Sequence, residues 1–382
     1  MEHSNNQWMD ILRRRGSVWL LLLIVLCLIL LSITVLYSVG RAESNGASVY
    51  ARKQMQWLVP AGIAFFIALK INYEKLRALA WPIGILTVLA LILVLIPGIG
   101  KVSNGARRWV DLGFLSIQVS DFAKLGYVFI MAHYLASIQR QSDSITKGFL
   151  IPVFMIALAF GLVLLEPDYG TAALLAATGG TMLFLSGCRM CYLVPTALCG
   201  ISLFAVAIYN NPVRMKRILS FLDIEGNKAD GSYQLYQGIL GYGVGGIDGV
   251  GLGNGRQQMA FLPEAHTDFI FPIIGEELGF IFTGGVVLGF LAFFLLVVWR
   301  LRQAPDMFQF LLVVGALMLI TIQALFNLGV VTGCLPTKGI SLPFISYGGS
   351  NLVIMMTLVG LILNRLLSWE RIPWSKQLEV KG

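Results

Sequence analysis

The first long apolar stretch runs from residue 18 to residue 37 and reads VWLLLLIVLCLILLSITVLY. It contains no charged residue, and Arg13, Arg14 and Arg15 precede it closely. About 20 apolar residues are what a helix needs to cross the hydrocarbon core of a bilayer. The stretch ends without a small-x-small cleavage motif, and more such stretches follow. We therefore interpret it as a retained membrane helix rather than a signal peptide.

The remainder of the chain repeats this pattern. Of its 382 residues, 57% are hydrophobic and 13% are charged, whereas a soluble domain carries roughly 25% charged residues. The apolar residues form long blocks rather than short alternating segments, so the spans are helices. We predict an all-α polytopic membrane protein, a single transmembrane domain over residues 1–382 with ten transmembrane helices. Their approximate limits are 17–37, 56–70, 78–96, 118–138, 148–165, 171–186, 190–208, 269–300, 306–333 and 348–368.

Lysine and arginine residues determine the predicted orientation. With a cytoplasmic N-terminus, 15 of them lie in cytoplasmic segments, 7 lie in short outer loops and five more lie in a long outer loop. Cytoplasmic segments carry the positive excess, and long loops count little in this rule. We therefore predict cytoplasmic N- and C-termini, and a large extracytoplasmic loop at residues 209–268, between the seventh and eighth helices.

The net charge of +8 is spread over these loops rather than gathered in a basic domain. This favours anionic lipids or a phosphate-bearing substrate as partners, and we predict no nucleic-acid binding. Residues 214–222 form a basic amphipathic stretch, typical of a helix at the membrane interface. The glycine-rich run 238–255 lacks the preceding strand of a nucleotide-binding loop. We interpret it as a flexible or re-entrant segment whose backbone can approach a ligand or a neighbouring helix.

Two pairs of charged residues lie inside or beside predicted helices. Lys124 follows Asp121 by one helical turn, and a lysine within a span requires an acid or a polar cavity beside it. This pair is either a structural ion pair or a cation site for lipid phosphate. Glu166 and Asp168 interrupt an apolar run; Asp168 either caps the next helix or lines a cavity together with Glu166.

The densest group of reactive side chains lies in FLPEAHTDFIF, residues 261–271. Glu264, His266 and Asp268 come directly before a long apolar helix. Acids this dense at a membrane boundary are typical of a transport pathway or a reaction site. Asp268 can simply cap the helix, but a carboxylate at the edge of a partly dry site also suits a general base.

Several cations stand in the predicted outer loops. Arg108, beside Trp109, and Arg256 lie in two of them, and Lys338 lies in a third, shortly before the last helix. Near Ser350, serine and glycine residues can present backbone N–H groups at a helix start, which makes an anion site. A phosphate-bearing ligand on the outer face would account for this distribution.

In these segments the sequence resembles the SEDS family (shape, elongation, division and sporulation), and within it the FtsW branch. The matching segments follow one another in order along most of the chain: residues 104–109, 117–118, 122–125, 166–171, 251–257, 263–271 and 336–350. The chain departs from the family where a proline and a glutamate are usual, because it has Val119 and Asp121 there. Aspartate keeps the charge on a shorter arm.

The resemblance implies ten helices and an inverting peptidoglycan glycosyltransferase that polymerises lipid II into β-1,4 glycan strands during septal cell-wall synthesis. It assigns Asp268 as the catalytic residue. Arg108, Lys124, Arg256 and Lys338 are expected to stabilise the leaving pyrophosphate, and a divalent cation, Mg or Mn, can share that task. The predicted substrate-binding residues are Arg108, Trp109, Asp121, Lys124, Glu166, Asp168, Arg256, Glu264, His266, Lys338 and Ser350.

The expected partners are lipid II, the undecaprenyl-pyrophosphate-linked glycan, a class B penicillin-binding transpeptidase resembling FtsI, and other divisome membrane proteins. The expected location is the bacterial cytoplasmic (inner) membrane at the division septum. A lipid II flippase, a scaffold that activates its transpeptidase, a RodA-like elongation polymerase and a SpoVE-like sporulation protein stay open as alternatives. The segments GNGRQ and PEAH favour the division branch.

Overall fold

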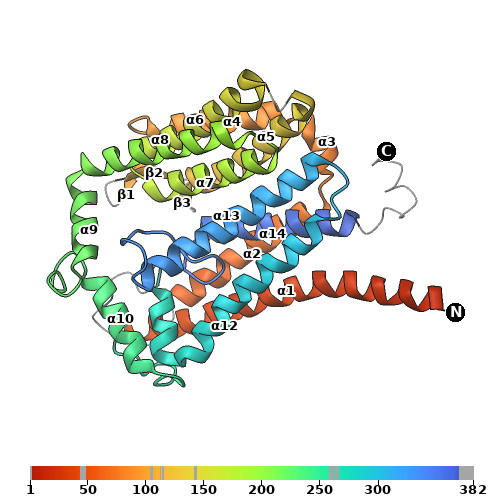
Figure 1. Ribbon diagram of the computed structural model, residues 1–382. Helices are drawn as coiled ribbons and strands as arrows, with labels where there is room; N and C mark the ends of the chain where they lie inside the picture. The colour runs from red at the N-terminus through yellow and green to blue at the C-terminus, as the bar shows by residue number, and fades with distance from the viewer. Residues whose placement is uncertain are drawn as a thin grey trace.

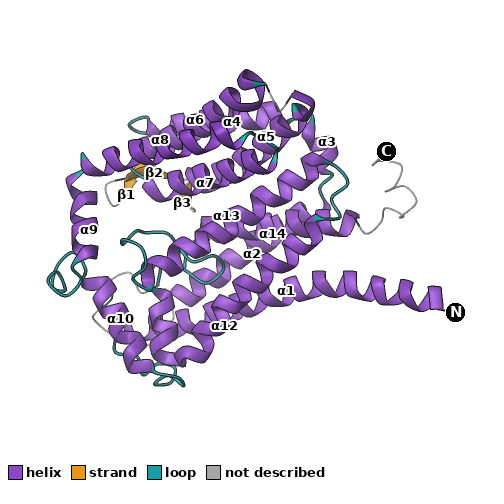
Figure 2. Ribbon diagram, viewed as in Figure 1, coloured by secondary structure: helices purple, strands orange, loops and turns teal. Residues whose placement is uncertain are grey.

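The computed structural model describes residues 2–43, 49–103, 106–111, 113, 116–141, 144–257, 262 and 266–369. Within these residues the chain is almost entirely helical (Figure 2). Its α-helices are α1 (Glu2–Glu43), α2 (Val49–Lys70), α3 (Tyr73–Arg77), α4 (Ala80–Leu95), α5 (Val119–Ser137), α6 (Ile151–Leu165), α7 (Tyr169–Leu185), α8 (Met190–Tyr209), α9 (Pro212–Leu222), α10 (Tyr233–Gly245), α12 (Ile270–Leu301), α13 (Met307–Val331) and α14 (Gly349–Trp369). A 3-10 turn (Gln139–Gln141) follows α5, and a π-helical segment (Ile145–Leu150) runs directly into α6.

A helix occupies each of the ten predicted ranges. Among the described residues, six helices are long and apolar enough to cross a membrane, namely the apolar part of α1, α6 with its π-helical start, α8, α12, α13 and α14; α4 and α7 are shorter apolar helices. The chain is therefore a multi-pass membrane protein. The number of ten spans stays a prediction.

Helix α13 lies at the centre of the molecule. It packs against α5 and α7 on one side and against α12 and α14 on the other. Figure 1 shows α4 to α8 as one group, with α1, α2, α10, α12 and α14 on the other side of α13, and α9 joining the two groups at one end. Because α13 is buried along most of its length, polar side chains on it can hold loops from both groups.

A small antiparallel sheet, which the sequence did not lead us to expect, lies between α4 and α5. Its strands, in the order β1-β2-β3, are β1 (Lys101–Ser103), β2 (Ala106–Asp111) and β3 (Ser116–Gln118). Trp109 on β2 pairs with Gln118 on β3. The purely α-helical prediction is therefore incomplete. Strands this short carry too little periodicity to stand out beside long apolar blocks.

Helix α12 is not the continuous helix predicted from its apolar sequence. It breaks at Gly279, whose backbone has φ 76°. The loop after α10 fills the break, because Phe280 N donates to Gly246 O (2.9 Å) and Val250 N donates to Glu276 O (2.9 Å). A side chain at Gly279 would collide with the backbone of Ile247, so glycine is required there.

The glycine-rich run 238–255 was predicted as a flexible or re-entrant segment, and it differs from that prediction. Its first part belongs to α10, which packs against α12. Its second part is held by a carboxylate of α12, since Gly253 N donates to Glu277 Oε1 (2.9 Å). The predicted close approach of glycine backbone to a neighbouring helix is confirmed at Gly245, where a Cβ atom would lie 2.0 Å from Gly275 O.

Candidate active site

A polar cavity of about 1510 Å³ is lined from both groups of helices. Its walls come from α2, β2, β3, α5, the turn between α6 and α7, α9, the loop before α12, α13 and the loop before α14. The described lining carries more positive than negative side chains: Lys53, Arg108, Lys124, Arg214, Lys216, Arg217 and Lys338 against Asp121, Asp168, Asp230 and Asp268. An excess of fixed positive charge in a cavity favours an anionic ligand.

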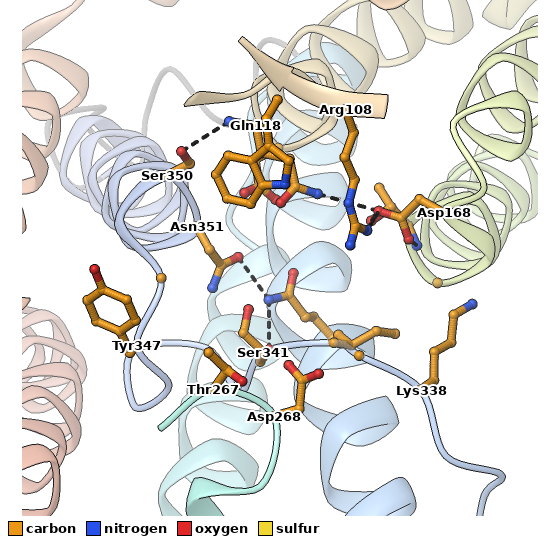
Figure 3. A pocket seen from close by; sticks show the side chains of 18 of the residues that line it. Arg108, Gln118, Asp168, Thr267, Asp268, Lys338, Ser341, Tyr347, Ser350 and Asn351 are labelled. Atoms are coloured by element: carbon orange, nitrogen blue, oxygen red, sulfur yellow. Dashed lines mark hydrogen bonds and ion pairs between the residues drawn. The ribbon is translucent and has the colours of Figure 1, made fainter. Parts of the chain in front are cut away.

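Asp268 stands at the end of the loop before α12, half-buried in the cavity wall. Figure 3 shows its carboxylate directed into the space that Lys338 also faces. It does not act as the N-cap of α12, because that position belongs to Phe269, which makes no side-chain capping bond. Gly339 lies directly against the carboxylate, since a Cβ atom there would be 2.7 Å from Asp268 Oδ2. The acid is therefore presented to the cavity rather than used to start a helix.

Arg108 and Asp168 form an ion pair across the opposite wall. Arg108 Nη1 donates to Asp168 Oδ2 (2.9 Å), and Asp168 also accepts bonds from Thr171 N (3.1 Å) and Thr171 Oγ1 (2.9 Å). Burial by itself would raise the pKa of Asp168, but Arg108 and these bonds hold it below its usual value. Asp168 thus caps α7 and also lines the cavity, but it lines the cavity without Glu166.

Glu166 lies behind this wall. Its side chain is fully buried and is absent from the cavity lining. Burial, reinforced by repulsion from Asp168, raises the pKa of Glu166 to about 8. At neutral pH this carboxyl is therefore protonated, and it does not form the predicted pair of charged carboxylates with Asp168.

A buried hydrogen-bonded chain starts at Lys124. Its Nζ donates to Asp121 Oδ1 (2.7 Å) and to Gln323 Oε1 (3.2 Å). Gln323 Nε2 then donates to Ser341 O (3.0 Å) and Asn351 Oδ1 (2.9 Å). The predicted i,i+3 ion pair is present, and it lines the cavity as well. It connects α5, α13 and the loop before α14.

Arg214, Arg217 and Lys338 bring three positive charges to one side of the cavity. Arg214 lies over the ring of Tyr169 (4.9 Å), and Lys338 Nζ lies 5.9 Å from the centre of the same ring. Burial lowers the pKa of Lys338 to about 7; attraction to Asp168 opposes this, and repulsion from the neighbouring arginines adds to it. Crowded cations of this kind are stabilised by a bound anion.

Aromatic rings complete the lining. Trp57, Trp109, Tyr169 and Tyr347 all contribute to the cavity surface. Such rings offer flat apolar faces beside hydrogen-bonding groups. A ligand with apolar ring faces and polar edges fits this mixture.

The structure brings most of the predicted site residues together. Eight of them line the cavity: Arg108, Trp109, Asp121, Lys124, Asp168, Asp268, Lys338 and Ser350. Two others lie elsewhere. Arg256 is exposed, and its backbone N donates to Glu276 Oε1 (2.8 Å), while the ring of His266 stacks on Tyr50 (4.1 Å between centroids) rather than lining the cavity. Glu264 lies outside the described residues.

Other lining residues were not singled out from the sequence. Arg214 and Arg217 were noted only as part of an amphipathic stretch, although their i,i+3 spacing places both on one face of α9. Gln323 is a polar residue in the apolar helix α13. Its presence there could have been used to predict a functional position.

A magnesium or manganese site stays a prediction. Within the described ranges, no three His, Cys, Asp or Glu side chains lie close enough together to hold a metal ion.

The fold and the cavity define a multi-pass membrane protein with a cation-rich site between its two groups of helices. The family model that carries the names FtsW, RodA and SpoVE, described as “Cell cycle protein”, matches residues 16–368. The chain belongs to this family, and the resemblance seen in the sequence is confirmed.

Individual relatives agree with this assignment. The chain is 36% identical to stage V sporulation protein E of Bacillus subtilis (strain 168), over 90% of this chain and 95% of that protein. It is 42% identical to the probable peptidoglycan glycosyltransferase FtsW of Coxiella burnetii (strain RSA 493 / Nine Mile phase I), over 72% of this chain and 75% of that protein. Its fold matches a chain of a solved peptidoglycan synthase complex with a TM-score of 0.76 at 24% identity, covering 93% and 98% of the two chains.

Proposed function

We propose that the cavity is the active site of a peptidoglycan glycosyltransferase, which polymerises lipid II into β-1,4 glycan strands for the septal cell wall. Family membership and the names of the relatives support the class of enzyme. The observation that carries the proposal is the position of Asp268: its half-buried carboxylate faces a cavity that it shares with Arg217 and Lys338.

The reaction joins two lipid-linked sugars. Asp268 accepts the proton of the 4-hydroxyl of the acceptor N-acetylglucosamine, and that oxygen attacks the anomeric carbon of the donor N-acetylmuramic acid. The new O–C bond forms as the bond from carbon to the phosphate oxygen breaks. Inversion produces the β-1,4 linkage, and undecaprenyl pyrophosphate leaves with the bonding electron pair.

The negative charge that develops on pyrophosphate requires cations that are not already neutralised. Arg108 and Lys124 each have a carboxylate partner, at 2.9 Å and 2.7 Å respectively. Arg214, Arg217 and Lys338 also repel one another, although Asp268 attracts Arg217 and Asp168 attracts Lys338, and an anion bound among the three cations relieves this repulsion. We therefore assign pyrophosphate stabilisation to these three cations and leave Arg256, which lies away from the cavity, out of it.

The placement of the polar side chains favours a polymerase over a transporter. Many of the lining side chains lie in the N-terminal parts of α2, α5, α7 and α14 and in the loops before α12 and α14, while Gln323 lies inside α13. A lipid II flippase needs polar groups along the whole path across the membrane. A transpeptidase-activating scaffold, the remaining alternative, does not need a cavity that pairs an acid with a cation cluster.

The proposal includes the setting of the reaction. Ten helices would span the cytoplasmic membrane with both termini inside, which puts the cavity and residues 209–268 on the outer side at the division septum. A class B penicillin-binding transpeptidase would cross-link the product; the fold match to a peptidoglycan synthase complex supports such a partner.

The test is an assay of the purified protein with lipid II, with and without the transpeptidase. We expect glycan strands from the wild type and none from Asp268→Ala at equal thermal stability. Asp230→Ala is a matched control, because Asp230 also lines the cavity but pairs with the exposed Lys216 (2.5 Å). Full polymer synthesis by Asp268→Ala would refute the role of the acid.

The same assay separates the alternative functions. Lipid II movement across vesicles without polymer would identify a transporter, and stimulation of the transpeptidase alone would identify a scaffold.

A further inference from the structure

A buried amide on α13 connects the loop of Asp268 to the loop of Lys338. Asn327 is 1% exposed. Its Nδ2 donates to the backbone oxygen of Asp268 (2.9 Å) and to the backbone oxygen of Ile340 (2.7 Å). The two acceptors are more than 70 residues apart in the chain, so this one side chain joins two loops that the sequence keeps separate.

The geometry matches the chemistry of an asparagine amide. Nδ2 carries two hydrogens, one for each carbonyl. A serine or threonine at this position has one donor hydrogen and reaches one loop only, and a leucine has the right size but no donor. Asparagine is thus the smallest uncharged side chain that can hold both loops at once.

Both loops carry groups that the proposed reaction needs. Asp268 ends one of them, and Lys338 stands two residues before Ile340 in the other. The loops are in direct contact, because a Cβ atom on Gly339 would lie 2.7 Å from Asp268 Oδ2. The length of the Asn327 bridge therefore fixes how far the base lies from the cation.

One turn earlier on the same helix, Gln323 repeats the arrangement. Its Nε2 donates to Ser341 O (3.0 Å), in the loop that also holds Lys338. Helix α13 packs between the two groups of helices and is buried along most of its length. Two successive amides thus attach these loops to a helix that is buried along most of its length.

We propose that Asn327 is a positioning residue for glycosyl transfer, which sets the Asp268 base and the Lys338 cation at the separation that the reaction requires. The inference rests on the proposed function, because it assumes the roles of Asp268 and Lys338. A displacement of about 1 Å in a reacting group can cost on the order of 100-fold in rate. Loss of the bridge should therefore lower kcat far more than it weakens lipid II binding, because Arg214, Arg217 and most of the cavity walls are not held by the bridge.

The test compares the buried Asn327 with the half-buried Asn364. Asn327→Leu removes the bridge at nearly constant volume. Asn364→Leu is the matched control, because Asn364 Nδ2 also donates to backbone oxygens, those of Leu69 (2.6 Å) and Ile71 (3.0 Å), but lies outside the cavity. We expect kcat about 100-fold lower for Asn327→Leu, with KM for lipid II within about threefold of the wild type. The control should lose a similar amount of thermal stability and keep its kcat.

Two further variants keep the outcome decisive. If Asn327→Leu does not fold, Asn327→Ser, with a single donor, should give a smaller loss of kcat at unchanged KM. The inference is wrong if a folded Asn327 variant keeps full kcat, or if Asn364→Leu loses as much. Asp268→Asn is assayed in parallel: if it remains active, the proposed function fails, whereas an inactive Asp268→Asn beside a fully active Asn327→Leu overturns only this inference.

Discussion

Two walls of the same cavity handle charge in opposite ways. In the first, Arg108 pairs with Asp168 and Lys124 pairs with Asp121, so that each cation has a carboxylate within hydrogen-bonding distance; we call it the paired wall. In the second, Arg214, Arg217 and Lys338 lie close together; burial lowers the pKa of Arg217 and of Lys338, and repulsion from the neighbouring arginines adds to it. We call it the cationic wall.

This difference indicates which charged side chains stabilise the fold and which are available to bind a ligand. A buried ion pair that is already formed has little left to offer an anion, and breaking it is costly. Cations that repel one another gain energy when an anion enters between them. We infer that the paired wall gives the cavity its shape and that the cationic wall binds the pyrophosphate.

The largest effect should come from neutralising the cationic wall. Loss of one preorganised group that stabilises a developing charge costs about 100- to 1000-fold in rate. The double variant Arg217→Gln, Lys338→Met should lose at least about 1000-fold in lipid II polymerisation, with thermal unfolding in detergent unchanged. Lys228→Met is the control. Like Arg217, Lys228 lies in the segment between α8 and α12, but it faces the ring of Tyr236 (6.0 Å) rather than the cavity. A double variant within tenfold of the wild type would contradict the distinction between the walls.

Breaking the paired wall should reduce stability instead. Asp121 and Lys124 are both at least 95% buried, so Asp121→Asn leaves a buried lysine without its carboxylate. The expected cost is about 3–5 kcal/mol in the free energy of unfolding. Adding Lys124→Met should restore most of it, because the uncompensated charge is then gone. Thermal unfolding followed by tryptophan fluorescence measures both, and equal stability of the single variant and the wild type would show that the pair is not structural.

Features of the fold and of the site could be predicted from the sequence where they depend on neighbouring residues, but not where they depend on contacts between distant segments. The helices follow from long apolar blocks, and those of about 20 residues suffice for a span without any tertiary information. Asp268 and Lys338 could be named because each lies in a polar segment beside an apolar helix. Their proximity could not be predicted, since it results from the way α13 holds the two loops.

The errors have physical causes as well. Arg256 was expected in the site because it is a cation in a glycine-rich loop, but the carboxylates of α12 hold that loop by its backbone and leave the side chain exposed. The break at Gly279 was missed because the loop that satisfies its backbone is about 30 residues away in the chain. Asn327 could have been found, because a polar residue within an apolar helix is costly and usually functional.

A smaller effect concerns pH. The pKa of Lys338 is lowered to about 7, so the empty cationic wall loses a charge as pH rises through neutrality. Inhibition by inorganic pyrophosphate should weaken about tenfold between pH 6 and pH 8, in proportion to the protonated fraction of this lysine. Lys338→Arg keeps its charge over this range and should flatten the dependence. The same pH slope in wild type and Lys338→Arg would remove Lys338 from the anion site.

The smallest effect on activity should come from substituting Glu166, which lies behind the paired wall. This substitution tests whether the side chain acts as a charged group or as a neutral polar group. Because the folded-state pKa of Glu166 is raised to about 8 from 4.5, the group is neutral at pH 7, and Glu166→Gln should keep polymerisation within about twofold. A raised folded-state pKa means that folding takes up a proton, so stability from this group is complete below about pH 4.5 and is lost as pH rises through 8. The wild type should therefore lose thermal stability between pH 5 and pH 8 more steeply than Glu166→Gln. Parallel pH profiles, or a large loss of activity at pH 7, would mean that Glu166 is charged and belongs with Asp168 in the cavity after all.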